Sequence, residues 1–284
     1  MTRYIYILFL TLSLSATMYA QRSWLGISPI ATTNWQFDDS QLTTPKTGVG
    51  AGLGVVYQLQ KQHFLMELGV EALYNYYQVG LADSLLAFRM IDTKGTSFVY
   101  KGRLYDRKDV SHTMDIRIPI MFGAEFTYVY FLAGAKLHIH LYGKHSAHAC
   151  LTTSGEYDIF YDEIVNLPSH GFTDARPIKS YCDMNYNIDL RPTIEVGASL
   201  NHQPNRSKIH LGIFVEYGVL NTIPRKQTEE LIVPDLSQYM QVDLKHVYAT
   251  QHASRLNHLS VGMRFKAFLQ IQGKRRNNCR CLDY

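Results

Sequence analysis

The sequence has few of the features that mark familiar classes of protein. It contains only 2 tryptophans against 20 tyrosines and 13 phenylalanines, and aromatic side chains are enriched in strands. After the N-terminal residues, no stretch approaches the roughly 18 consecutive apolar residues that a transmembrane helix requires. The formal net charge is only +4, too small an excess to indicate nucleic-acid binding. The chain is therefore expected to be a β protein that is either exported and soluble or crosses a membrane with strands.

Motifs of common catalytic and cofactor sites are also missing. Glycines between Gly48 and Gly54 recur at every second residue, which is not the G-x-G-x-x-G spacing of dinucleotide loops. The sequence has no G-x-S-x-G or H-E-x-x-H motif. Loop residues that could contribute to a hydrolase site are not selected by their spacing: His145, His148, Ser154 and His170. We expect no enzyme activity and no cofactor, and keep an outer-membrane enzyme as an alternative.

The four cysteines form two pairs. Cys150 and Cys182 flank one expected loop, and in an exported protein a disulfide between them is possible. Cys279 and Cys281 form a C-x-C near the C-terminus. Two thiolates alone make a poor metal site, so we expect no metal there.

The first twenty residues resemble a secretory signal peptide. Arg3 precedes an apolar run from Ile5 to Leu14, and small residues come before the expected cleavage after Ala20. The alternative, a membrane anchor, is disfavoured because the run is short for a spanning helix. The expected division is a signal peptide at 1–20, a β domain at 21–270 and a basic tail at 271–284.

Apolar and polar residues alternate in long segments, most clearly in the stretch Ser111–Gly143. Strict alternation is typical of strands with one apolar and one polar face. Eight segments share it: Trp24–Ala31, Gly48–Leu59, Phe64–Val79, Met114–Phe122, Phe131–Leu141, Ile188–Asn201, Lys208–Leu220 and Leu256–Leu269. Short connections alternate with long ones, as in outer-membrane barrels with periplasmic turns and extracellular loops. The sequence thus predicts an all-β, eight-stranded antiparallel transmembrane up-and-down β-barrel.

The polar faces of these segments carry nearly balanced charge. Seven acids and six bases are joined by histidines, and together the side chains expected to form a lumen charge network are Glu67, Glu71, Asp115, Arg117, Glu125, Lys136, His138, His140, Asp189, Arg191, Glu195, Lys208, His210, Glu216, Arg264 and Lys266. An eight-stranded barrel is just wide enough to be filled by side chains. Paired charges would plug it, because an unpaired buried charge costs several kcal/mol. A narrow pore or proton path is the alternative.

Two other interpretations of the polar faces remain open. His138 and His140 share one strand face and could bind a metal, but zinc needs three or four ligands, so we expect hydrogen bonds to carboxylates. A secreted lipocalin-like barrel would turn the apolar faces inward around a ligand. Alternation alone does not say which face points inward. Charge-free faces with tyrosines near the strand ends favour contact with lipid.

The order of features resembles one known family. The signal peptide, the Gly-spaced segment GVGAGLGVVY and the segment Ile116–Ile120 (IRIPI) resemble the PorT-like outer-membrane β-barrel proteins of Bacteroidetes. The resemblance implies an outer-membrane location and a link to secretion or envelope assembly. The expected partners are outer-membrane lipid and a protein bound at the extracellular loops or the tail.

Of the loops, TSFVYKGRLYDRKDV is expected to extend the central hairpin, and 227–233 and 236–247 to hold short helices.

Overall fold

The computed structural model describes residues 22–91, 94–157, 163–165, 167, 172–183, 186–203, 207–223, 232–235 and 241–273. The predicted signal peptide (1–20) and the tail residues Cys279 and Cys281 lie outside the described residues. Strand β14 (Leu256–Gly273) includes the first three residues of the predicted tail. Within the described ranges, no helix is long and apolar enough to cross a membrane.

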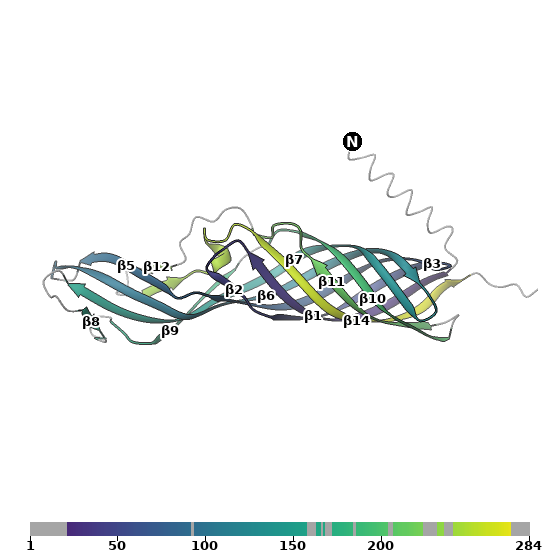
Figure 1. The fold of residues 1–284 in the computed structure, drawn as a ribbon, viewed down its shortest axis with the longest axis horizontal. Helices are drawn as coiled ribbons and strands as arrows, with labels where there is room; N and C mark the ends of the chain where they lie inside the picture. Colours follow the sequence, from purple (N-terminus) through teal and green to yellow (C-terminus); the bar gives the residue numbers. More distant parts are fainter. Residues whose placement is uncertain are drawn as a thin grey trace, which may run out of the picture.

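In the described part of the chain, eight long strands pair in chain order and close into a ring (Figure 1). They are β1 (Arg22–Asp38), β3 (Gly48–Lys61), β4 (Phe64–Leu81), β6 (Ser97–Glu125), β7 (Val129–Tyr157), β10 (Asp189–Gln203), β11 (Ser207–Tyr217) and β14. Every neighbouring pair is antiparallel, and β1 closes the ring against β14, with Leu25 opposite Leu269. Each of the eight segments that alternate in the sequence lies in or overlaps one of these strands.

The hairpin of β6 and β7 continues beyond the ring. Each strand is 29 residues long, and Figure 1 shows them running together into a narrow sheet at the left. Further strands join this extension: β5 (Ser84–Ile91) on β6, and β8 (Glu163–Val165) and β9 (Arg176–Asp183) on β7. The predicted extension of the hairpin through residues 96–110 is confirmed.

The last long connection differs from the prediction. Two short helices were expected at 227–233 and 236–247, but the described residues there form a hairpin of β12 (Ile232–Asp235) and β13 (Gln241–Leu244). A single 3₁₀ turn, η2 (Val247–Ala249), follows. The short strand β2 (Thr43–Pro45) pairs with β4. For the described residues of 227–233 and 236–247 the helix prediction was wrong, because segments this short are ambiguous between helix and strand; residues 227–231 and 236–240 lie outside the described residues.

The ring turns its charged faces inward and its apolar faces outward. On β11, Ile213 is 56% exposed, whereas Glu216 has no exposed surface. The same alternation holds around the ring. The outward-facing residues Leu25, Leu53, Ile194 and Leu269, on β1, β3, β10 and β14, are 45–68% exposed. The lipocalin-like alternative required the reverse orientation and is therefore wrong.

The suggested disulfide does not form. Cys150 lies opposite Pro177 in the β7–β9 ladder, while Cys182 lies opposite His145, and neither thiol is bonded to the other. Five residues on β7 separate the two positions, about 17 Å at ~3.3 Å per residue. A disulfide needs Cα atoms about 4–7 Å apart. Cys150 lies on β7 and Cys182 on the neighbouring strand β9, and the register between these two strands holds the cysteines apart.

Candidate functional site

The interior of the ring is a column of buried charges. All sixteen side chains assigned from the sequence to the lumen point inward, and each is buried, His140 with a side chain only 3% exposed. The alternation of the strands accounts for this placement, because residues two apart share a face. The ion pairs within the column follow from the register between strands, which the sequence does not specify.

At the turn end of the column, Glu125 on β6 contacts two basic groups. Lys208 Nζ donates to its carboxylate at 2.9 Å, and His210 Nε2 lies 3.1 Å away. Ser199 donates to the same carboxylate. The Lys208 ammonium also lies 4.9 Å from the centre of the buried Trp24 ring. This end therefore holds a charge cluster backed by an aromatic side chain.

The middle of the column joins Glu67 and Glu195 through one lysine. Lys266 Nζ lies 2.6 Å from Glu67 Oε2 and 2.7 Å from Glu195 Oε1. Tyr130 donates its hydroxyl hydrogen to Glu195 at 2.7 Å, and Arg264 Nη1 lies 3.2 Å from the other Glu195 oxygen. Arg264 also pairs with Glu71, which extends the network towards the loops.

Glu216 on β11 is the centre of the densest cluster. Three cations from other strands reach its carboxylate: Arg117 Nη1 at 2.8 Å, Lys136 Nζ at 2.9 Å and Arg191 Nη1 at 3.5 Å. Lys136 Nζ is also 3.8 Å from Glu71. Because β6, β7, β10 and β11 each contribute a charge, this cluster ties half of the ring together.

The two histidines considered as a metal pair have different surroundings. His140 Nδ1 lies 2.7 Å from Asp115 Oδ1, and Asn75 donates to the other Asp115 oxygen. His138 Nε2 lies 3.8 Å from Glu216. Asp189, the remaining acid of the column, accepts from Arg191 Nε at 2.7 Å. Among the described residues, no group of three or more potential ligands is arranged to hold a metal ion.

Above the column, near the loops, lies a cluster of which the sequence indicated only His145. Ser111 Oγ is 3.1 Å from His246 Nε2 and 2.7 Å from His145 Nδ1. His246 Nδ1 is 3.9 Å from Asp109 Oδ2. Asp109 and Ser111 continue the inward parity of β6, which the sequence could have revealed. His246 comes from a connection 135 residues further along the chain, and no local pattern predicts its approach.

The cluster has the residue types of a serine hydrolase, but His246 has the wrong protonation for a general base and the whole cluster is buried. His246 Nδ1 accepts a hydrogen bond from the Tyr248 amide, so the proton of the neutral ring is on Nε2, which donates to Ser111. His246 therefore cannot accept the serine proton, as a general base must. The other neighbour of the hydroxyl, His145 Nδ1 at 2.7 Å, belongs to a fully buried side chain. Burial and the charge of Arg107 lower the pKa of His246 to about 3, and Ser111 and His246 are each only 1% exposed. The cluster is thus a sealed structural network.

Among the described residues, no other residue considered for hydrolysis belongs to a second cluster of serine, histidine and carboxylate. Ser154 donates to Glu163, and His148 lies on the outer wall beside Ser146. His170 lies outside the described residues. Loop side chains cover the network around Ser111, where Tyr186, Ile223, Val247, Tyr248 and Leu256 pack together with Val79.

Comparisons with known proteins give similarity to solved structures alone. No family model matches the chain, and no curated protein matches it. Neisserial surface protein A is 9% identical, with 85% of this chain and 95% of that one covered and a TM-score of 0.31. Ail, the attachment invasion locus protein of Yersinia pestis, is 10% identical, with 88% and 99% covered and a TM-score of 0.28. In complex with the heparin analogue sucrose octasulfate, Ail is 11% identical, with the same coverage and a TM-score of 0.27.

Proposed function

We propose that this protein is an integral outer-membrane β-barrel with a charge-plugged interior, which acts through its loop-end surface and not by catalysis. The observation that carries the proposal is the apolar outer band. Every ring strand presents exposed large apolar side chains, while the charges of the same strands are buried inside. Soluble monomers rarely expose contiguous apolar patches larger than a few hundred Å².

The height of the band fits a bilayer. On β7 the outward side chains from Phe131 to Leu141 are apolar, and Phe131, Leu137 and Leu141 are 36–54% exposed. Ten residues span about 33 Å at ~3.3 Å per residue, and a strand tilt of about 40° reduces this to roughly 25 Å, the height of the apolar band of outer-membrane barrels.

Aromatic side chains border the band at both ends. Tyr74, Tyr142 and Tyr217 are exposed at the loop end, and Phe126 and Tyr128 at the turn end. Aromatic rings concentrate at the two interfaces of a membrane because they combine an apolar body with a polar or polarisable edge. Short turns at one end and long connections at the other favour the predicted orientation, with the turns in the periplasm and the extended β6–β7 hairpin outside the cell.

The role of the protein is proposed to be structural or interactive. Each of the seven interior acids lies within ion-pair distance of a basic group or histidine, and the loop-end cluster around Ser111 is sealed, which supports a plugged interior over a pore. The extension built on β6 and β7 offers a surface for a partner. The similarity to the PorT-like family supports a task in secretion or envelope assembly, which remains a proposal.

Membrane fractionation combined with a heat-modifiability gel tests the location. We expect the protein in the membrane fraction, extracted only by detergent, with an unheated band that migrates differently from the heated one. Recovery in the soluble fraction without detergent would overturn the proposal. Planar-bilayer recording tests the plug separately, since a steady conductance from the purified protein would contradict it.

A further inference from the structure

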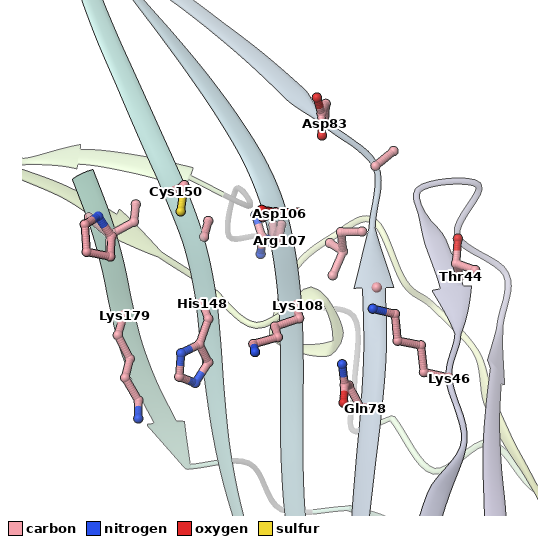
Figure 2. Close-up of a pocket in the computed structure, with 16 residues that line it drawn as sticks. Thr44, Lys46, Gln78, Asp83, Asp106, Arg107, Lys108, His148, Cys150 and Lys179 are labelled. Atoms are coloured by element: carbon pink, nitrogen blue, oxygen red, sulfur yellow. The ribbon is translucent and has the colours of Figure 1, made fainter. Parts of the chain in front are cut away.

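A groove of about 910 Å³ lies on the outer wall, beyond the apolar band, where β2, β4, β6, β7 and β9 meet. Figure 2 shows Lys46, Lys108, His148 and Lys179 at one level across these neighbouring strands. Asp83 lies apart from this row in the same view.

Strand register produces the row. Lys108 lies opposite Gly80 on one side and His148 on the other, and His148 lies opposite Lys179. Lys46 covers the position of Gly80, where a side-chain carbon would lie 3.0 Å from Lys46 Cε. Four basic side chains from widely separated parts of the sequence therefore stand side by side. The three lysines are exposed, and His148 is half-buried.

The charge of the row is not neutralised by the protein. Among the described residues, Lys46, Lys108 and Lys179 form no ion pair with an acid. Two acids line the groove: Asp83 is paired with Arg103 at 3.1 Å, and Asp106 pairs with none of the three lysines. Burial and the charges of Lys179 and Lys108 lower the pKa of His148. Neutral His148 therefore adds a hydrogen-bonding group to three positive charges, a composition that suits phosphate groups.

The height of the row above the membrane narrows the choice of ligand. Lys108 and His148 lie six residues beyond the exposed pair Met114 and Tyr142 on β6 and β7. Six residues span about 20 Å of strand, or roughly 15 Å above the band at a tilt of about 40°. The polar layer of an ordinary bilayer is only about 5–8 Å thick on each side. A short phospholipid headgroup would not reach the row.

A second basic group lies between the band and the groove. Lys144 is exposed two residues beyond Tyr142, and its ammonium is 5.3 Å from the centre of the Tyr181 ring. Lys179 Nζ lies 4.7 Å from the same ring. Basic side chains thus continue from the membrane interface up to the groove on one wall of the protein.

We infer that this wall binds a membrane glycolipid whose elongated headgroup carries several phosphates, with its acyl chains along the apolar band and its outer phosphates in the groove. The inference rests on the proposed membrane location. A phosphate-bearing ligand is chosen because its negative charges complement the lysines of the row. A simple phospholipid is excluded because its headgroup is too short to reach a row about 15 Å above the apolar band.

Native mass spectrometry of the full chain in detergent micelles tests the inference with three probes. They are a glycolipid with a phosphorylated oligosaccharide headgroup, phosphatidylglycerol, and the same oligosaccharide freed of its acyl chains. Each lysine near an anionic lipid contributes about a fivefold gain in affinity. The triple variant Lys46→Gln, Lys108→Gln, Lys179→Gln is therefore expected to bind the glycolipid roughly 100-fold more weakly, with little change for phosphatidylglycerol.

The matched control removes the same charge elsewhere, with Lys61→Gln, Lys94→Gln and Lys101→Gln, and should bind the glycolipid as the unmodified protein does. If the triple variant folds poorly, the single variant Lys108→Glu replaces it.

Equal glycolipid binding by triple variant and unmodified protein would overturn the inference. Equally tight binding of the free oligosaccharide would also overturn it, in favour of a soluble anion. A protein that needs no detergent would instead contradict the proposed membrane location, whichever probe binds.

Discussion

The hydroxyl of Tyr130 donates a 2.7 Å hydrogen bond to the Glu195 carboxylate across the interior of the ring. The bond passes over Gly212, where any side-chain carbon would collide with the Tyr130 oxygen. The absence of a side chain at one residue thus allows a polar contact between two others, and the same carboxylate also accepts from Lys266 and Arg264.

The variant Gly212→Ala is expected to destabilise the protein by about 1–3 kcal/mol, the usual cost of overpacking a filled interior. Urea unfolding in detergent, followed by the heat-modifiable band, measures the change. The double variant Gly212→Ala, Tyr130→Phe makes room for the methyl group, and should lose less stability than the sum of the two single variants. Additive losses would show that the two residues do not compete for the same space.

Replacing Glu216 by Gln leaves Arg117, Lys136 and Arg191 around a neutral amide. Because removal of one partner from a buried ion cluster leaves charge uncompensated, we expect a loss of about 3–5 kcal/mol in the free energy of unfolding. The control Lys101→Gln breaks an exposed pair with Glu156, and should have little effect because solvent screens exposed pairs. A small effect of Glu216→Gln would mean that the cluster is hydrated and that the interior is open.

Stability should fall below pH 6.5 because of His246. Its pKa is about 3 in the folded protein and about 6.5 in an unfolded chain. Between these values the unfolded state binds the extra proton, so this residue favours unfolding by up to about 1.4 kcal/mol per pH unit as the pH falls. Neighbouring Asp109 acts in the opposite sense, because burial raises its pKa. The effect of Asp109 on stability is present both in the unmodified protein and in His246→Asn, so it cancels when the two are compared.

Urea midpoints at pH 7.5, 6.5, 5.5 and 4.5 measure the dependence on His246. The unmodified protein should lose stability more steeply than His246→Asn over this range. His148→Gln serves as the control, and should leave the slope nearly unchanged because His148 is only partly covered. Parallel curves for the unmodified protein and His246→Asn would contradict the assignment.

Ser111 should be unreactive towards a fluorophosphonate probe of serine hydrolases, because Ser111, His145 and His246 are all buried and the probe cannot reach the hydroxyl. The variant Ser111→Ala should instead lose stability by about 1–3 kcal/mol, because it leaves His145 and His246 with a missing buried partner. Labelling that disappears in Ser111→Ala would support the alternative of an outer-membrane enzyme.

The variant Ile213→Arg places a charge in the middle of the apolar band. In a bilayer this substitution should make folding into the membrane less favourable by about 2–4 kcal/mol. The cost falls to about 0–1 kcal/mol near an interface, which the variant Ile271→Arg at the turn end tests. Leu85→Arg on β5, where the side chain is 81% exposed beyond the ring, should be neutral. Folding of each variant into lipid vesicles measures the difference. Equal behaviour of all three would count against a membrane-spanning band.

The sequence by itself determined the strands and their two faces. Alternation with a period of two assigns Glu216 and Ile213 to opposite sides without reference to any other strand, because the pleat fixes the direction of successive side chains. It also separated the side chains that became the interior column from those of the outer band. The resemblance to the PorT-like family led to the prediction of an outer-membrane location and of a link to secretion or envelope assembly.

Tertiary structure decided which face points inward and which groups meet. In the ring closed by β1 and β14, the charged faces point inward. Register brought Tyr130 to Glu195, kept Cys150 away from Cys182, and aligned Lys108 with His148 and Lys179. The Ser111 cluster needed His246 from a distant connection. These contacts depend on pairing between segments far apart in the chain, and a pattern with a period of two specifies the face of a strand but not its partner or its register.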